Sequence, residues 1–254
     1  LKQSTSFDES YIRSTIKETY EFIERDLDEA LKLTKNMDIV NNKYRSWRGS
    51  KGAANAFAAR YWLNRNDYNK ALEYANVALE AHDVMMNHNT DMRYSSIPSN
   101  VNVGGVQVPV LYPYTHDNQS DLTDMMEWKE LYYFRLMYHE SWWYIPSPEL
   151  LSLYDTDYDL RYKYHIVDNY SLDRGVTNPP YEYPGYIFFF KDRIPSGPTV
   201  AEMLLIKAES HARLGQLSPA LDAVNKLREN RIDDSAPNSA KYLTAANSGE
   251  ALTL

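Results

Sequence analysis

Apolar residues recur at helical spacing in two distant stretches of the chain, residues 54–79 and residues 203–228. When the two stretches are aligned from their first residues, Ala59 matches Ala208 and Asn76 matches Asn225. Each stretch predicts an apolar helix, a turn of three or four residues and a second helix, which is the pattern of a tetratricopeptide-type helix pair. We therefore expect helical hairpins at about 51–82 and about 199–230.

The turn of each hairpin carries a residue that can cap the second helix. Asn69 and Ser218 fall at equivalent places, where a side-chain oxygen can accept a hydrogen bond from a free backbone N–H. Pro219 would then be the first helical residue, where its missing N–H costs nothing. The sequence thus predicts Asn69 and Ser218 as helix caps.

A long amphipathic helix is predicted ahead of the first hairpin, over residues 8–34. Ile16 and Ile23 are among the apolar residues that recur there at helical spacing, and Ser6 with Glu9 is placed as a capping box. Two hairpins are too few to bury their own faces, because each repeat needs a neighbour on both sides. Other parts of the chain must therefore cover them.

The pattern between the hairpins is irregular. Residues 83–120 contain several prolines and Gly104-Gly105, with only a hint of alternation among the valines of residues 101–110. Residues 123–144 are so rich in aromatic and apolar side chains that we expect a buried mixture of helix and strand. Residues 155–199 are again irregular, with one strand predicted at 186–191.

Two smaller features complete the prediction. Ser147, Pro148 and Glu149 form a favourable helix start, so a helix of about two turns is expected to end near Tyr154. After Arg231 the chain is polar, and no closing helix is expected.

These elements predict an all-α (mainly α) fold, built from tetratricopeptide-like helical hairpins with long irregular loops and little strand. The chain of 254 residues is 43% hydrophobic, which supports a substantial core. We expect residues 1–254 to form a single domain.

Charge and composition exclude several classes of protein. The net charge of −8 argues against a nucleic-acid partner, because phosphate binding requires clustered Lys and Arg. The absence of Cys excludes disulfides and thiolate chemistry. No apolar run approaches the roughly 18 residues that a membrane span requires, and the first residues do not begin a signal peptide.

Motifs for metal binding or catalysis are weak. Asp155, Asp157 and Asp159 alternate as in a calcium loop, but Leu160 and Ile166 occupy the positions that need Gly and Glu. A structural turn in which a carboxylate meets Arg161 is the simpler interpretation. No zinc-type His spacing, phosphate loop or nucleophile elbow is present. We predict no metal, no cofactor and no enzymatic activity, although a pair of glycosidase carboxylates stays open among 35 acids.

Four stretches in this order resemble the SusD/RagB family. They are DLDEALKL, RGSKGAANAFAARYWLNRNDYNKALEYANVAL, PSPELLSLYDTDYDLRY and GPTVAEMLLIKAESHARLGQLSPALDAVNKLR, and together they cover about half of the chain. Members of that family are outer-membrane lipoproteins that capture glycans or peptides for a TonB-dependent transporter. They usually begin with a signal peptide and a lipid-bearing Cys, and they continue beyond the late hairpin, so the chain is expected to lack both ends.

The resemblance implies a non-catalytic receptor on the surface of the outer membrane. Its partners would be an oligosaccharide or peptide ligand and a SusC-like TonB-dependent transporter, with the membrane reached only through a lipid anchor absent from this chain. A tetratricopeptide scaffold that binds peptides and, less favoured, a glycan-cleaving enzyme are the alternatives.

Aromatic side chains mixed with polar ones outside the regular helices are the candidate ligand residues. The chain has 22 Tyr and 5 Trp, whose flat faces can stack on sugar rings. Trp142 and Trp143 are consecutive, so on an extended chain they point to opposite sides and one can belong to the core. The predicted contacts are Tyr112, Tyr114, His116, Asp117, Asn118, Trp142, Trp143 and Tyr144.

Overall fold

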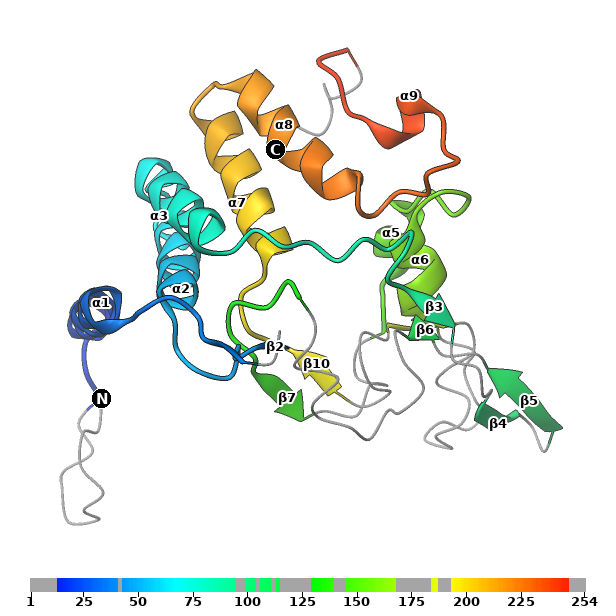
Figure 1. The fold of residues 1–254 in the computed structure, drawn as a ribbon, viewed down its shortest axis with the longest axis horizontal. Coiled ribbons are helices and arrows are strands. Elements are labelled where there is room, and N and C mark those ends of the chain that lie inside the picture. The colour runs from blue at the N-terminus through cyan, green and yellow to red at the C-terminus, as the bar shows by residue number, and fades with distance from the viewer. Residues whose placement is uncertain are drawn as a thin grey trace.

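The computed structural model describes residues 13–40, 43–94, 99–103, 106–110, 113–114, 129–138, 145–167, 184–186 and 193–246. These residues are mainly helical, and their strands are short and pair two at a time (Figure 1), which confirms the predicted fold class. The helices are α1 (Ile16–Leu33), α2 (Lys51–Asn64), α3 (Tyr68–Ala81), α5 (Pro148–Ser152), α6 (Leu160–His165), α7 (Val200–Arg213), α8 (Leu217–Arg228) and α9 (Asn238–Lys241). The strands are β1 (Ile39–Val40), β2 (Lys43–Tyr44), β3 (Arg93–Tyr94), β4 (Ser99–Val103), β5 (Val106–Val110), β6 (Pro113–Tyr114), β7 (Leu136–Tyr138), β8 (Ile166–Val167), β9 (Gly185–Tyr186) and β10 (Arg193–Pro195).

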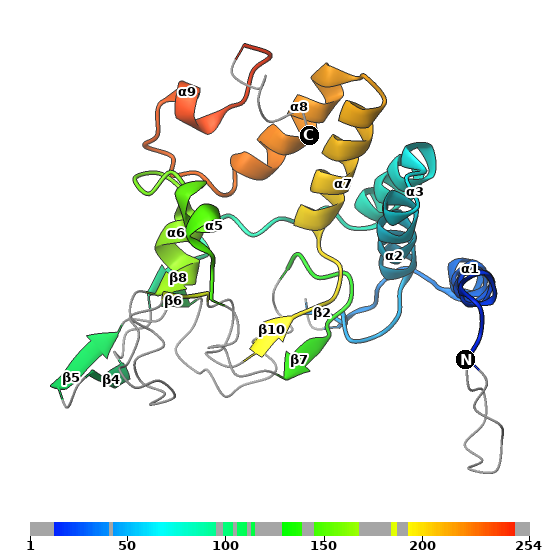
Figure 2. The ribbon, with the colours of Figure 1, turned by 180° about the vertical axis from the view of Figure 1, so that it is seen from behind.

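Both predicted helical hairpins are present and they stack on each other. α2 and α3 form the first hairpin, α7 and α8 form the second, and α7 packs against α3, as Figures 1 and 2 show from opposite sides. Asn66 and Gly215 occupy aligned positions and both have positive φ, 58° and 74°. A single left-handed residue lets the chain reverse after the first helix, so three residues complete each turn.

The predicted cap of α3 is wrong. α3 begins at Tyr68, and the carboxylate of Asp67 accepts a hydrogen bond from the Lys70 N–H at 3.1 Å. Asn69 therefore lies inside the first turn of the helix. The left-handed conformation of Asn66 brings the helix start forward by two residues.

The predicted cap of α8 is wrong for the same reason. α8 begins at Leu217, and Pro219 is its third residue instead of its first. The preceding residue, Gln216, makes no side-chain capping bond, because its amide oxygen contacts Nδ1 of His211 at 2.6 Å. Ser218 thus lies within the helix.

The core between the hairpins is built from small residues. Ala56, Ala59, Ala71, Ala75 and Ala78 of the first hairpin have no exposed surface, and they pack with Val200, Met203 and Ile206 of α7. Alanine at these positions lets the helix backbones approach closely. The repeated Ala pattern in the sequence is therefore the contact surface of the hairpins.

Tyr132 supplies part of the cover that two hairpins need. Its side chain is completely buried in the hairpin core, and its hydroxyl donates to the carbonyl of His82 at 2.6 Å. Gly52 makes room for it, because a Cβ at Gly52 would lie 2.9 Å from Cδ1 of the Tyr132 ring. Of the stretch predicted to be a buried mixture of helix and strand, residues 129–138 are described: Glu130, Leu131 and Tyr132 are buried and β7 is a strand, but these residues contain no helix. Residues 123–128 and 139–144 lie outside the described residues.

The leading helix begins later than the sequence predicts. Thr15 caps α1 and forms a capping box with Glu18, so Ile16 is the first helical residue. Ser6 and Glu9 lie outside the described residues. α1 packs beside α2, where the hydroxyl of Tyr61 donates to Glu24 at 2.6 Å.

The region expected to be irregular contains an antiparallel hairpin of β4 and β5. Their register pairs Val101 with Val108 and Val103 with Val106. The valine alternation is therefore a strand signal. Of the strand predicted at 186–191, β9 contains its first residue, and residues 187–191 are outside the described part.

The C-terminal segment carries a short helix, α9, where none was expected. The side chain of Asn225 on α8 holds the following residues in place, since its amide donates to the Leu243 carbonyl at 2.9 Å and accepts from the Leu243 N–H at 2.8 Å. Arg228 also donates to the Lys241 carbonyl at 2.9 Å. Side chains of α8 therefore fold the tail back, which periodicity alone does not reveal.

Candidate functional site

The ligand residues predicted from sequence are mostly beyond the described part of the chain. Tyr112, His116, Asp117, Asn118, Trp142, Trp143 and Tyr144 lie outside the described residues. Tyr114 is in β6, where its backbone pairs with Arg93 of β3. Tyr114 is thus the one predicted ligand residue within the described part of the chain.

Tyr94 joins that ribbon to α6. Its hydroxyl donates to the Lys163 carbonyl at 3.0 Å, and its ring lies 5.5 Å from the ring of Tyr164. Tyr94 remains 41% exposed. Burial of the remainder raises the pKa of its phenol, and Tyr164 adds to the shift, so the hydroxyl stays protonated at neutral pH.

A hollow of about 270 Å³ opens between Tyr94 and α6. Three tyrosines contribute to its walls. The exposed carboxylate of Asp157, the hydroxyl of Thr156 and the exposed ammonium group of Lys163 lie beside them. Aromatic faces beside polar groups can hold a ligand that has both apolar and hydroxylated surfaces. The lining residues are Tyr94, Thr156, Asp157, Tyr158, Asp159, Leu160, Tyr162, Lys163 and Ile166.

The wall formed by α6 is fixed by the Asp–Arg element that the sequence predicted. Asp159 accepts from Nε and Nη2 of Arg161 at 3.0 and 2.6 Å, and its carboxylate also caps the Arg161 N–H at 2.9 Å. The structural interpretation of this carboxylate is confirmed. Among the described residues no cluster of three or more metal-ligating side chains occurs.

Backbone contacts tie the same wall to the end of the second hairpin. Leu160 donates its N–H to the Arg231 carbonyl at 2.9 Å, and Asp233 donates its N–H to the Tyr158 carbonyl at 2.9 Å. Asp155 closes the preceding turn by accepting from the Asp157 N–H at 3.1 Å. The tyrosines of the hollow are therefore positioned by the helical scaffold.

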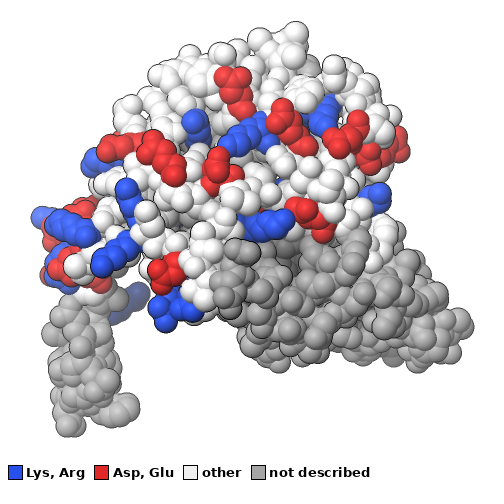
Figure 3. All heavy atoms as spheres, in the orientation of Figure 1, with Lys and Arg blue, Asp and Glu red and all other residues white. Residues whose placement is uncertain are grey.

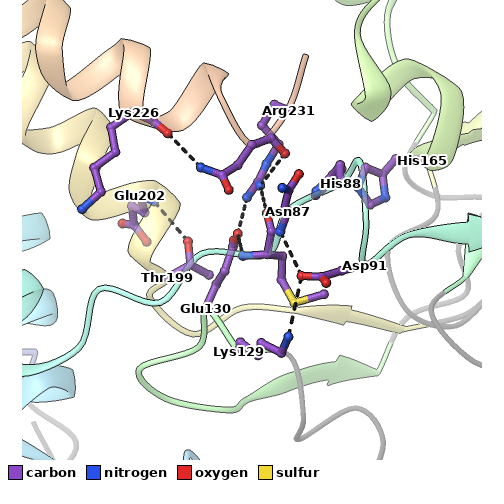
Figure 4. A network of polar contacts seen from close by, with 12 residues as sticks. Asn87, His88, Asp91, Lys129, Glu130, His165, Thr199, Glu202, Lys226 and Arg231 are labelled. Carbon is purple, nitrogen blue, oxygen red and sulfur yellow. Dashed lines mark hydrogen bonds and ion pairs between the residues drawn. The ribbon is translucent and has the colours of Figure 1, made fainter. Parts of the chain in front are cut away.

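A buried polar network lies between the end of the second hairpin and residues 86–91 and 129–130 (Figure 4). Glu130 and Arg231 form an ion pair with side chains only 3% and 7% exposed. The Met86 backbone joins both partners, since its N–H donates to Glu130 at 2.8 Å and its carbonyl accepts from Arg231 at 2.6 Å. His88 and His165 meet next to this pair, with their Nε2 atoms 3.0 Å apart.

A second concave surface lies between α3, α7 and α8, with a volume of about 580 Å³. Leu79, Leu204 and Ala223 are among its apolar lining residues. Lys226 and Asp83 approach to 3.4 Å across it. Its lining carries both acidic and basic side chains, among them Glu80 and Lys207, so it has no single sign of charge. Acidic and basic side chains are likewise interspersed over the coloured part of the face in Figure 3.

Sequence reasoning missed the tyrosines of the hollow. Tyr158 and Tyr162 belong to a stretch that the sequence analysis interpreted as a structural turn, and Tyr94 comes from a segment more distant in the chain. The available signal was the density of Tyr beside Asp in residues 154–164. Their convergence with Tyr94 depends on the pairing of α6 with the β3–β6 ribbon.

Comparison with solved structures identifies the architecture. A SusD-like protein from Bacteroides fragilis matches 93% of this chain with a TM-score of 0.55 at 16% identity, over 58% of its own length. A SusD superfamily protein from Bacteroides thetaiotaomicron matches 94% with a TM-score of 0.58 at 15% identity, over 52% of its length. The chain has the SusD-like fold. A SusD-like carbohydrate binding protein from Bacteroides vulgatus also matches 94%, with a TM-score of 0.57 at 16% identity, over 48% of its length.

The chain thus spans about half the length of the SusD-like structures that it matches. No protein-family model matches the sequence, and no curated protein matches it. None of the helices in the described part of the chain is long and apolar enough to cross a bilayer.

Proposed function

We propose that the protein is a non-catalytic, SusD-like receptor that captures a glycan, with the tyrosine-lined hollow beside α6 as part of its binding site. The observation that carries the proposal is the convergence of Tyr94, Tyr158 and Tyr162 on one hollow of a SusD-like fold. A neighbour with this fold is described as a carbohydrate binding protein. Because sequence identity to these proteins is low, the ligand has to be inferred from the side chains of this site.

The chemistry of the hollow suits a sugar. Sugar rings present C–H faces that pack on aromatic rings and hydroxyls that bond to carboxylates, hydroxyls and amines. The hollow provides both kinds of surface, with Asp157, Thr156 and Lys163 beside the tyrosines. Its volume of about 270 Å³ is near the lower end for ligand pockets, so we expect it to hold one or two sugar units of a longer chain.

The proposal of capture without cleavage rests on the carboxylates of the hollow. A glycosidase needs two acids that are free to act on opposite sides of the scissile bond. Asp159 is held by both nitrogens of the Arg161 fork and caps α6, whereas Asp157 is exposed. This leaves Asp157 as the one unengaged acid among the residues that line the hollow.

We further propose that the receptor works at the surface of the outer membrane, as a lipoprotein that delivers its ligand to a SusC-like TonB-dependent transporter. Residues 1–254 would form a single domain of this receptor. The predicted contacts at Tyr112, Tyr114 and the other loop residues stay predictions and would extend the site beyond the hollow. The groove between α3, α7 and α8 supports the peptide-scaffold alternative, because its apolar floor can accept a peptide chain.

Affinity electrophoresis and calorimetry across a panel of glycans and peptides test the proposal. We expect the wild-type protein to bind at least one glycan, and Tyr94→Ala to weaken binding by about tenfold, because stacking of a ring on an aromatic face contributes about 1–1.5 kcal/mol. Tyr20→Ala is the matched control. Tyr20 is 37% exposed and stacks on Tyr61 at 6.1 Å, as Tyr94 stacks on Tyr164, but it lies on α1.

Three outcomes contradict the proposal. Binding of peptides with no binding of any glycan would favour the scaffold alternative. Release of reducing sugars from a bound glycan would show that the protein is an enzyme that cleaves glycans. Equal loss of affinity in Tyr94→Ala and Tyr20→Ala would move the site away from the hollow.

A further inference from the structure

Another hollow, of about 340 Å³, opens between the end of α1 and the turn that leads into α2. Figures 1 and 2 show β2 and the start of α2 away from α6 and the β3–β6 ribbon, so this hollow is separate from the tyrosine-lined one. Its volume is near the lower end for ligand pockets. It can therefore hold one small ligand or one unit of a longer one.

The charged lining of this hollow is mainly basic. Lys35, Arg45 and Arg48 contribute to it, against one acid, Asp38. The whole chain has a net charge of −8, and the lining of the hollow beside α6 and that of the groove between α3, α7 and α8 each contain more acids than Lys and Arg residues. Cations thus gather here against the overall charge of the protein, which favours an anionic ligand.

The three cations are only weakly engaged by the protein itself. The Arg45 guanidinium lies 5.9 Å from the centre of the Trp47 ring. Arg48 approaches Asp38 to 3.7 Å, with side chains 62% and 61% exposed, so water and salt screen this pair. In the part of the chain that the structure describes, no ion pair joins Lys35 or Arg45 to an acid. All three cations are therefore available to a ligand.

Hydrogen-bond donors of the residues before α2 complete the lining. Ser50 is 2% exposed, and within the described residues the N–H groups of Gly49 and Ser50 donate to no acceptor. The Ser50 hydroxyl accepts from the Ala53 N–H at 3.2 Å, and its own hydrogen is a further donor. Because buried N–H groups are normally paired and adjacent N–H groups commonly bind anions, these donors also point to an anion.

Backbone hydrogen bonds hold the walls of the hollow in place. The Lys51 N–H donates to the Lys35 carbonyl at 2.6 Å, which ties the end of α1 to the start of α2. The Arg45 N–H donates to the Asp38 carbonyl at 2.9 Å. The Arg48 N–H donates to the Arg45 carbonyl at 3.1 Å. The fold thus positions the backbone that carries the cations before a ligand arrives, which lowers the cost of binding.

We propose that this hollow is a second ligand site, which binds the carboxylate or sulfate group of an acidic sugar. Guanidinium groups donate in a fork that matches two oxygens of such a group, and the ammonium and backbone N–H groups add single bonds. The choice of an anion follows from these donors. The choice of a sugar rests on the proposed function.

Amide NMR of the whole chain, titrated with glucuronate and with galactose 6-sulfate, tests the proposal. We expect at least one of the two to move the amide protons of Gly49 and Ser50 downfield, because its acid group accepts from them. Glucose and galactose are the neutral controls and should cause no such shift. Absence of the shift with both acidic sugars would overturn the proposal.

Inorganic sulfate separates an acidic sugar from a free ion. We expect it to bind about tenfold more weakly than galactose 6-sulfate, because a sulfate ion leaves most of the hollow unfilled. Binding of inorganic sulfate as tight as that of galactose 6-sulfate would show an adventitious ion only and would overturn the sugar site.

Substitution of one cation tests the assignment of the side chains. Arg45→Gln should weaken binding of the acidic sugar by about tenfold, because a hydrogen bond between two charged groups is lost. Arg65→Gln is the matched control, since Arg65 lies over the ring of Tyr20 as Arg45 lies over Trp47, but at the far end of α2. Equal affinities of the two variants would contradict the site.

Asp38→Asn should change the affinity in the opposite direction. It removes the acid that competes with the ligand for Arg48, so we expect binding of the acidic sugar to tighten by about twofold to threefold. The Asp38 side chain is exposed, so this variant also serves if Arg45→Gln does not fold. Unchanged or weaker binding by Asp38→Asn would argue against the proposal.

Failure of this site and failure of the proposed function give different results. If a glycan binds and Tyr94→Ala weakens it, while no acidic sugar shifts Gly49 or Ser50, the second site fails and the receptor function stands. If acidic sugars shift Gly49 and Ser50 and depend on Arg45, while no ligand in the panel depends on Tyr94, the second site stands and the hollow beside α6 fails.

Discussion

Glu130 and Arg231 form the ion pair that joins the end of the second hairpin to the segment of residues 129–138 and to Met86. A buried pair offsets the cost of desolvating its two charges only while both partners are present. We therefore expect Glu130→Gln to lower the free energy of unfolding by about 3–5 kcal/mol, because it leaves the buried Arg231 unpaired. Urea denaturation measures this loss.

An exposed ion pair gives the control for that prediction. Glu209 and Arg213 on α7 are 3.4 Å apart with side chains 46% and 43% exposed. Glu209→Gln should cost less than about 1 kcal/mol. Replacing both Glu130 and Arg231 by Leu and Met should cost less than Glu130→Gln alone, and a larger cost for the double variant would contradict this account.

Gly197 is a second single residue on which the fold depends. A Cβ at this position would lie 1.6 Å from the carbonyl oxygen of Tyr133, so the strand that leads into α7 could not pass the segment of residues 129–138 as it does. We expect Gly197→Ala to destabilise the protein by about 3 kcal/mol or more. Gly49→Ala is the control, since nothing lies within 4 Å of its Cβ position, and equal melting temperatures for the two variants would refute the prediction.

At the scale of elements, each hairpin turn contains one residue in the left-handed backbone conformation. Gly215 has φ 74°, a conformation in which a Cβ is strained, so Gly215→Ala should lower the free energy of unfolding by about 1 kcal/mol. The aligned change in the first turn, Asn66→Gly, should be within about 0.5 kcal/mol of wild type. Thermal unfolding of both variants checks the pair, and a neutral Gly215→Ala would argue against the turn geometry.

Elements whose signal is local were predictable from the sequence. The hairpin helices follow from alanine spacing, and α5 follows from Ser147 and Pro148. The N-caps of α3 and α8 were not predictable, because the start of each helix depends on the backbone conformation of Asn66 or Gly215. The ribbon of β4 and β5 was underestimated, since five alternating valines among polar residues give a weak strand signal.

The candidate site was predictable only in its chemistry. The sequence indicated aromatic and polar ligand residues at 112–118 and 142–144, and it assigned residues 155–161 only a structural Asp–Arg element. The hollow itself joins Tyr94 to residues more than sixty positions later through contacts that are local in space and distant in sequence. Such contacts leave no periodic pattern in one sequence.

At the scale of the whole molecule, the SusD-like fold packs two helical hairpins against each other and connects them to the segment that contains α6. The scaffold places α6, which carries Tyr162, through the bond between Leu160 and Arg231, and it places Tyr158 through Asp233. Tyr94 is held in turn by the Lys163 carbonyl of α6. Rigid helices that present ligand residues on connecting segments are a common arrangement in binding proteins. The proposed capture of a glycan uses this arrangement.

A crystal structure of the protein with a glycan identified by the binding panel tests the central claim most directly. The account predicts a sugar ring in contact with the face of Tyr94, Tyr158 or Tyr162, with its hydroxyls near Asp157 or Lys163. A fully occupied glycan bound elsewhere, with the hollow beside α6 filled only by solvent, would contradict it.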